Sequence, residues 1–280
     1  MIGKLLVVGT PIGNLGDMSP RAVDAMQDCD FIAAEDTRVT LKLLNHFGIK
    51  KPLISYFEHN KLERGDIICN RIMNGENCVL VSDAGMPAIS DPGEILVRQC
   101  AERGICVSVV PGPSAVIAAL AVSGLPTGRF TFEGFLSMNK KSRKQHLEDV
   151  KDETRTMVFY EAPHKLAATL KDMFNAFGNR KIAIVREITK IHEEVIRTTL
   201  QEACQNYCDN PLKGEIVLVI DGTQNVHQEQ IYSLDMAIDL ANSFISEGFS
   251  TSEAAKKASQ ESGLKKGDIY RAIIENNIAD

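Results

Sequence analysis

Residues 78–93 read CVLVSDAGMPAISDPG, and this stretch decides the fold class. The apolar run at 78–81 is typical of a buried strand. The loop after it holds two Gly, two Pro and two Asp within residues 83–93, a composition that shapes backbone rather than filling a core. In an open α/β sheet, a ligand crevice is expected at the carboxyl ends of the strands. The stretch therefore predicts a ligand loop, although an ordinary strand-to-helix turn shares its local pattern.

Short apolar runs alternate with helix-like segments before residue 112, which predicts βα units and a parallel sheet. Beyond residue 112 the pattern changes to a helix at 115–122 and a period-two segment at 129–135. A probable hairpin between 186 and 197 predicts that the second sheet is mixed. We expect two α/β domains, 1–112 and 113–222, and a linker with a helical C-terminal segment at 223–280.

Composition narrows the classes of protein that fit. The chain has 280 residues, 44% of them apolar and 24% charged, as in an ordinary globular protein. The longest apolar run, 116–122, is too short to span a bilayer, and the amino terminus is expected to be a strand, so we expect a cytoplasmic protein without membrane contact. A net charge of −6 restricts any nucleic-acid role to one basic face. Seven scattered cysteines favour a reducing compartment and predict no metal site.

Three further loops at strand ends carry Gly, Pro or polar side chains. The loop at 9–16 has the spacing GxxxGxxG, which fails the dinucleotide fingerprint, and the chain has no Walker lysine motif. Glu35 and Asp36 directly follow a predicted strand, where Asp36 could equally cap the next helix. In the loop at 111–115, Ser114 begins a helix whose free N–H groups can hold a carboxylate. Together these loops predict one ligand cleft.

The stretches that carry chemistry resemble the ribosomal RNA small subunit methyltransferase I group of the tetrapyrrole-methylase superfamily. They cover residues 4–222 in the family's order: GTPIGNLGD, AAEDTR, VSDAGMPAISDPG, VPGPSAVIAAL, FEGFL, FYEAPHKL, VREITKIHEE and KGEIVLVIDG. The resemblance implies two α/β domains with S-adenosylmethionine in the cleft between them, and a homodimer. It also implies methylation of a cytidine ribose 2′-hydroxyl in the decoding region of small-subunit (16S) ribosomal RNA. Naked RNA and the assembled small subunit both remain open as the substrate.

The family's cofactor contacts carry over to nine positions of this sequence. They are Pro11, Ser82, Asp83, Ala84, Gly85, Ser114, Ala115, Tyr160 and Glu161. Met86 departs from the pattern, because many relatives have Thr there, which affects one hydrogen bond.

The implied reaction needs a proton acceptor and contacts to RNA. Because a ribose hydroxyl is weakly acidic, a carboxylate near it would help, and the candidates are Glu35, Asp36 and then Glu187. Arg38, Arg186 and Lys190 are candidates for phosphate contacts, although each could be a surface ion pair. A mobile loop that clamps the RNA backbone is expected at Lys140, Lys141, Arg143 and Lys144.

Two other functions remain as alternatives. A methyltransferase of the same fold could act on a tetrapyrrole or other small molecule, but the basic cluster at 140–144 and the C-terminal segment disfavour it. A non-catalytic protein could bind RNA through the tail, where helix-like segments flank Ser262, Gly263 and Leu264 as in a helix-turn-helix. The same tail would also suit a helical cap on the core.

Overall fold

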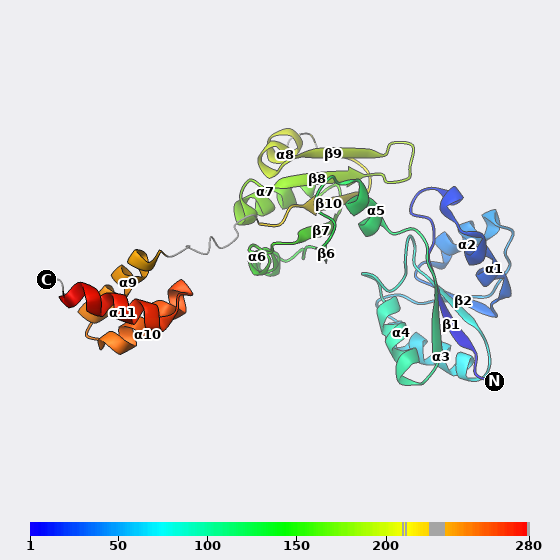
Figure 1. Cartoon of the computed structure of the whole chain (residues 1–280). Helices are drawn as coiled ribbons and strands as arrows, with labels where there is room; N and C mark the ends of the chain where they lie inside the picture. The colour runs from blue at the N-terminus through cyan, green and yellow to red at the C-terminus, as the bar shows by residue number, and fades with distance from the viewer. Residues whose placement is uncertain (209, 211, 224–232, 279–280) are drawn as a thin grey trace. The chain divides into compact units, whose positions relative to one another are not determined.

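The computed structural model describes residues 1–208, 210, 212–223 and 233–278. The chain separates into two compact units, unit 1 (residues 1–223) and unit 2 (residues 224–280). Unit 1 holds two five-stranded sheets, and unit 2 is helical (Figure 1). The predicted fold class, α/β with helices at the C-terminal end, is confirmed.

The first sheet is parallel throughout, as the alternating pattern predicts. Its strand order is β3-β2-β4-β1-β5. The strands are β1 (Lys4–Val8), β2 (Phe31–Ala34), β3 (Leu53–Ser55), β4 (Cys78–Val81) and β5 (Cys106–Val110). Because all five run the same way, the loops after them gather at one edge of the sheet.

Helices cover both faces of this sheet (Figure 1). One layer packs α1 (Pro20–Asp28) and α2 (Thr37–His46), and the other packs α3 (Lys61–Met73) and α4 (Gly93–Glu102). A short 3₁₀ turn, η1 (Leu15–Asp17), precedes α1. The Ser19 hydroxyl accepts from the Ala22 N–H and Pro20 opens α1, as the sequence predicts. The central strands β2 and β4 are buried along their whole length and are continuous apolar runs.

The second sheet is mixed, which confirms the change of pattern after residue 112. Its order is β6-β7-β10-β8-β9, where β6 and β7 are parallel and the other pairs are antiparallel. The predicted hairpin is the pair β8 and β9. The strands are β6 (Phe130–Phe135), β7 (Thr156–Glu161), β8 (Lys181–Arg186), β9 (Glu194–Thr199) and β10 (Ile216–Ile220).

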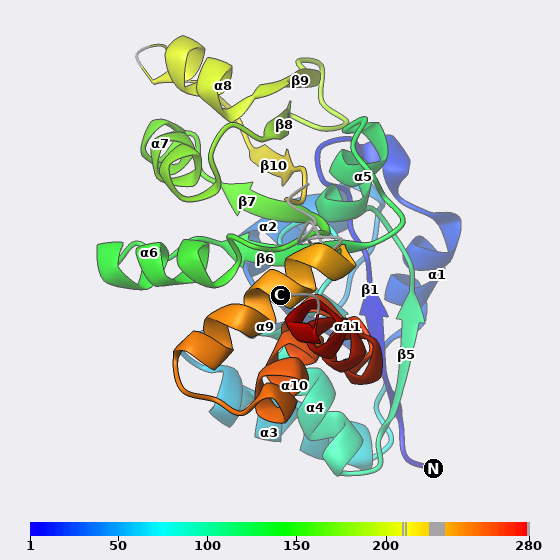
Figure 2. The ribbon, with the colours of Figure 1, turned by 60° about the vertical axis from the view of Figure 1, so that its left-hand side comes forward.

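Helix α5 (Ala115–Val122) packs on one face of the second sheet. The other face is covered by α6 (Lys140–Asp149), α7 (Leu166–Phe177) and α8 (Leu200–Tyr207) (Figure 2). The mobile loop expected at 140–144 is instead the first turn of α6. Asn139 caps this helix by accepting from the N–H groups of Lys141 and Ser142, and the buried Leu147 anchors it to the core.

Unit 2 has a core of its own, built from alanine and isoleucine side chains. It contains α9 (Leu234–Ser246), α10 (Thr251–Ser262) and α11 (Lys266–Ile278). Ser250 and Glu253 form a capping box on α10, and Gly263 ends that helix with φ +71°. Most of the predicted linker, residues 224–230, lies outside the described residues. Within the part of the chain that the structure describes, no helix is long and apolar enough to cross a membrane.

Candidate active site

A cavity of about 470 Å³ lies in unit 1, lined by residues from both sheets. Its volume falls within the roughly 300–1,000 Å³ typical of small-molecule sites. The first sheet contributes the loops at the carboxyl ends of its strands, and the second contributes β6, β7 and the start of β10. Nine predicted site residues line it: Glu35, Ser82, Asp83, Ala84, Gly85, Ser114, Ala115, Tyr160 and Glu161. Pro11 is not among the lining residues, and its neighbour Ile12 is.

Backbone contacts fix the loop after β4 against the loops after β1 and β5. Gly85 has φ +83°, and it exchanges two hydrogen bonds with Thr10 at 2.9 and 3.1 Å. A Cβ on Gly9 would lie 2.7 Å from the Cα of Gly112, so these two loops touch through bare backbone. Met86, the departure from the family pattern, accepts from the Gly112 N–H through its sulfur at 3.3 Å. The Met86 thioether therefore takes part in the contact between the loops after β1 and β5.

The two aspartates of the loop have different roles. Asp91 Oδ1 accepts from the N–H groups of Ala88 and Gly93, at 3.0 and 2.7 Å, and so holds the loop's own turn. Asp83 Oδ1 accepts from the N–H of Asp36 at 2.9 Å, and so joins the loops after β4 and β2. Both aspartates line the cavity, but Asp91 holds the turn of its own loop, whereas Asp83 joins two loops and lies next to Glu35.

Glu35 is the predicted proton acceptor that lines the cavity. Burial raises the pKa of its carboxyl above the usual value. The negative charges of Asp83, Asp91 and Asp36 raise this pKa further, whereas a hydrogen bond from the Asp83 N–H lowers it. Asp36, next in sequence, is engaged elsewhere. It caps α2 and pairs with Arg38 through both oxygens at 3.0 and 2.6 Å, and these hydrogen bonds lower its pKa to about 2.

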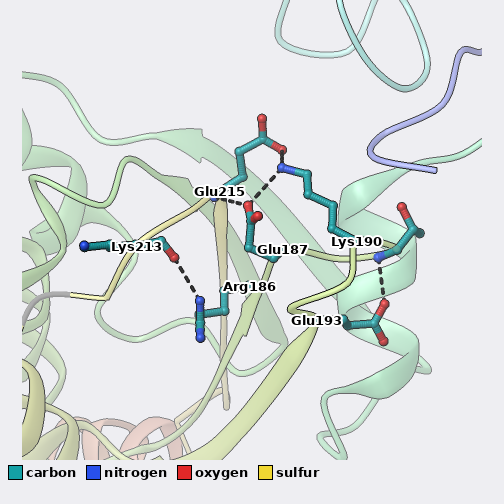
Figure 3. Close-up of polar contacts among 7 residues, drawn as sticks. Arg186, Glu187, Lys190, Glu193, Lys213 and Glu215 are labelled. Atoms are coloured by element: carbon teal, nitrogen blue, oxygen red, sulfur yellow. Dashed lines mark hydrogen bonds and ion pairs between the residues drawn. The ribbon is translucent and has the colours of Figure 1, made fainter. Parts of the chain in front are cut away.

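Glu187 lies in a polar network at the β8–β9 turn, shown in Figure 3. Its Oε1 accepts from Lys190 Nζ and from the Glu215 N–H, both at 2.9 Å, and the Lys190 contact lowers the pKa of Glu187. Lys190 also pairs with Glu215 Oε2 at 3.1 Å. Glu187 is outside the cavity lining, while its neighbours Ile188 and Glu215 are part of it. This carboxylate is therefore a structural ligand of the turn.

The same turn reaches the first half of unit 1. A Cβ on Gly13 would lie 2.5 Å from Lys190 Cγ, which places the lysine stem against the loop after β1. Glu187 and Thr189 both have positive φ, at 51° and 66°, and Glu193 accepts from the Thr189 N–H at 2.6 Å. The network holds a strained turn from which Ile188 lines the cavity.

Several predicted phosphate ligands already have partners. Arg186 pairs with Glu194 at 2.6 Å. It also donates to the Lys213 carbonyl at 3.1 Å (Figure 3). Arg143 pairs with Asp172 at 2.5 Å. Of the predicted phosphate ligands, those that are exposed and have no ion pair to a described residue are on α6: Lys140, Lys141 and Lys144.

Glu161 and Tyr160 close the second-sheet side of the cavity. Glu161 is buried and accepts from the Ala162 N–H at 2.7 Å and from the Thr169 hydroxyl, so it anchors the β7–α7 turn. The Tyr160 ring packs edge-on against Phe132, with centroids 5.0 Å apart. Other lining residues were not predicted: Ile89, Phe135, Ile188, Glu215, Ile216 and Val217 among them. The period-two strand and the family-like stretch FEGFL both contain Phe135, but neither indicated that its side chain reaches the cavity.

Two α/β halves with a cavity at the carboxyl ends of a parallel sheet define an α/β protein with a small-molecule binding site. Residues 4–204 match the Tetrapyrrole (Corrin/Porphyrin) Methylases, and the chain belongs to this family. Within it, the chain is 46% identical over 275 residues to "Ribosomal RNA small subunit methyltransferase I" of Synechocystis sp., with 98% of each chain covered. It belongs to the group of relatives with that name.

Two further relatives match only part of this chain. The relative of the same name in Thermotoga maritima is 46% identical over 223 residues, which are 100% of its own length and 80% of this chain. A solved uroporphyrin-III C-methyltransferase from Thermus thermophilus, complexed with S-adenyl homocysteine, superposes with a TM-score of 0.56. That structure is 16% identical and covers 78% of this chain and 97% of its own, so it shows the likeness of fold alone.

Proposed function

We propose that this protein transfers a methyl group from S-adenosylmethionine to the ribose 2′-hydroxyl of a cytidine in the decoding region of small-subunit ribosomal RNA. Family membership makes it a methyltransferase, and the name of its nearly full-length relatives supports small-subunit RNA as the acceptor. The observation that carries the proposal is the cavity in which one half-buried carboxylate, Glu35, stands beside the loop after β4. A ribosomal RNA substrate also favours a cytoplasmic location. The family resemblance favours a homodimer.

The cavity fits the cofactor that the family implies. Ala84 and Gly85 add almost no side-chain bulk to its wall, which leaves room for a flat ring. Ser114 begins α5 without capping it, so the first N–H groups of that helix are available to an anion. Thr10 fixes this wall through two backbone hydrogen bonds to Gly85. Ser82, Asp83 and Ala115 complete the set that would hold the cofactor.

The chemistry asks little of the protein. S-adenosylmethionine supplies a methyl group that is already activated by its sulfonium. The protein must align the ribose hydroxyl, exclude water and accept a proton. Glu35 accepts that proton in our proposal, because its raised pKa brings its basicity closer to the operating pH than an ordinary carboxylate's.

The test is transfer of tritium from labelled S-adenosylmethionine to small-subunit ribosomal RNA, offered both naked and in assembled subunits from cells that lack the enzyme. Digestion to nucleosides should place the label on 2′-O-methylcytidine. A tetrapyrrole, uroporphyrinogen III, is offered in parallel, and labelling of it instead would contradict the proposal. Absence of S-adenosylmethionine binding in calorimetry would favour a non-catalytic RNA-binding protein.

A further inference from the structure

Strand β6 contains an irregularity that changes the direction of its last side chain. Its pairing with β7 shifts register between Phe132 and Gly134, and Gly134 has φ +66°. In an unbroken strand, residues 132 and 135 would point to opposite faces. Here both Phe132 and Phe135 contact the ring of Tyr160, with centroids 5.0 and 5.3 Å away. The bulge therefore brings Phe135 to the cavity side, a common role of bulges beside active sites.

The redirected ring lies open at the edge of the cavity. Phe135 is 58% exposed, and Ile89, on the loop after β4, is 52% exposed, yet both line the same cavity. The two segments approach closely, because a Cβ on Gly134 would lie 3.5 Å from Ser90 Oγ. Glu35 lines this cavity as well. A large aromatic face exposed beside a polar reaction site suits a flat apolar ligand.

We propose that Phe135 and Ile89 form a slot for the target nucleobase of the RNA, with the base stacked on Phe135 and its ribose directed toward Glu35. The inference rests on the proposed function and names how that substrate is held. Proteins that recognise single-stranded RNA bind its unstacked bases on aromatic side chains, and enzymes that modify a base turn it out of its strand. The phenyl ring offers no hydrogen bond, so the slot fixes the position of the nucleotide and does not read its identity.

The chain that follows β6 supports the same substrate. Helix α6 begins five residues after Phe135, at Lys140, and Lys140, Lys141 and Lys144 are exposed there. Cations beside an aromatic platform are the usual combination for single-stranded nucleic acid, since the cations contact phosphates and the ring stacks a base. A small anionic substrate would need the cations but not an open ring of this kind.

The experiment compares Phe135→Leu and Phe135→Trp with the wild-type chain, and uses Phe130→Leu as the matched control. Phe130 is 36% exposed at the other end of the same strand and is not part of the cavity lining. The readouts are kcat/KM for small ribosomal subunits that lack the modification, and the Kd of S-adenosylmethionine from calorimetry. Phe135→Leu should lower kcat/KM about 10-fold or more, the scale of one lost base–aromatic stack. Its Kd for S-adenosylmethionine should stay near the wild-type value.

Phe135→Trp keeps an aromatic face and should retain most of the activity, and Phe130→Leu should behave as the wild type. The inference is overturned if Phe135→Leu methylates subunits normally. It is also overturned if the loss of kcat/KM is matched by an equal loss of S-adenosylmethionine affinity, or if the Trp variant is no better than Leu. If the wild-type chain itself does not methylate the subunits, the proposed function fails, which is a distinct result.

Discussion

Three carboxylates near the cavity differ in what already binds them. Asp36 is held by Arg38 and by the start of α2, and Glu187 is held by Lys190 and the backbone of Glu215. Glu35 lines the cavity and has a raised pKa. At the scale of single residues, this difference in partners supports our proposal that Glu35 is the base.

Replacing Glu35 by Gln should lower kcat by roughly 10²- to 10⁴-fold, the usual contribution of a general base, with S-adenosylmethionine binding retained. The base must be deprotonated to act, so the rate falls as pH drops through its pKa. Because that pKa is raised, the acid limb of kcat/KM should lie above the ordinary value of 4.5 for a glutamate. Measurement of pH–rate profiles checks both points.

Glu187→Gln is the matched control for that experiment, and it should keep the acid limb in place. If Glu35→Gln retains more than about a tenth of the wild-type kcat, a different group takes the proton.

Lys190→Met should destabilise the protein without changing how RNA binding responds to salt. The lysine is engaged by Glu187 and Glu215, and its loss leaves two carboxylates side by side at a strained turn. We expect a loss of about 1 kcal/mol, which is about 2–4 °C in melting temperature for a unit of this size. Lys144→Met, on the exposed helix α6, should leave the melting temperature unchanged and make RNA binding less sensitive to salt. Equal melting temperatures for the two variants would contradict a structural role of Lys190.

From the sequence, Glu35 and Asp36 rank ahead of Glu187 as candidates, but the sequence does not separate Glu35 from Asp36. Glu35, Asp36 and Arg38 are adjacent in the chain, and nothing in that order says which carboxylate the arginine takes. The pairing depends on Asp36 being the N-cap of α2, since this places its oxygens at the Arg38 backbone and side chain. Likewise, Lys190 meets Glu215 across 25 residues, a contact that no local pattern contains.

At the scale of elements, helix α6 follows strand β6, whose last residue lines the cavity. This helix carries exposed lysines. A helix fixes the spacing of Lys140, Lys141 and Lys144 at its first two turns, so they can meet successive phosphates without first being ordered. A mobile loop would lose that entropy on binding.

Changing these three lysines together to Gln should weaken RNA binding at every sequence. The slope of log K against log salt should become less steep by about 2, because each cation that contacts single-stranded RNA contributes about 0.7. Binding titrations at several salt concentrations measure this slope. Lys171→Gln, an exposed lysine on the neighbouring α7, should leave it unchanged. A slope that stays constant in the triple variant would place the RNA elsewhere.

The sequence predicted the strands and most helices because their apolar periods are clear. It missed α6, since four basic residues in five positions give no apolar stripe over the first turn, and only the Asn139 cap and the buried Leu147 show the helix. It also missed Phe135, because a bulge leaves the period-two pattern of 129–135 unchanged while it reverses the face of the last residue.

At the scale of the whole molecule, the chain consists of two units, and no hydrophobic core cluster of the described residues spans both. Four clusters lie within residues 1–223, and the fifth is built only from α9, α10, α11 and their connections. The relative from Thermotoga maritima aligns over 223 residues, the length of unit 1. The cavity and its lining lie in unit 1.

Residues 1–223 alone should therefore fold, bind S-adenosylmethionine with nearly the affinity of the full chain, and retain methyl transfer at saturating RNA. Any loss should appear in KM for RNA. Calorimetry and steady-state kinetics on the truncated chain test this. A truncated chain that aggregates, or that loses cofactor binding, would mean that unit 2 completes the site.

The division of unit 1 into two sheets followed from the sequence, because parallel and mixed sheets have different patterns around residue 112. The cavity between them could be anticipated only as a set of strand-end loops, since its second-sheet wall comes from residues such as Ile188 and Val217 that look like ordinary core.

The left-handed residues of the cavity wall have a consequence for any attempt to engineer this enzyme. In the described part of the chain, the non-glycine residues with positive φ are Ala88, Ser90, Glu187 and Thr189, all in the two loops that border the cavity. Each holds roughly 1–3 kcal/mol of backbone strain. Replacing Ala88 or Ser90 by glycine would relieve the backbone strain. It would also increase the conformational entropy of the unfolded chain and the flexibility of the loop. Thermal robustness and the precision of the catalytic pocket are thus set by the same few peptide units, so selection for one will alter the other.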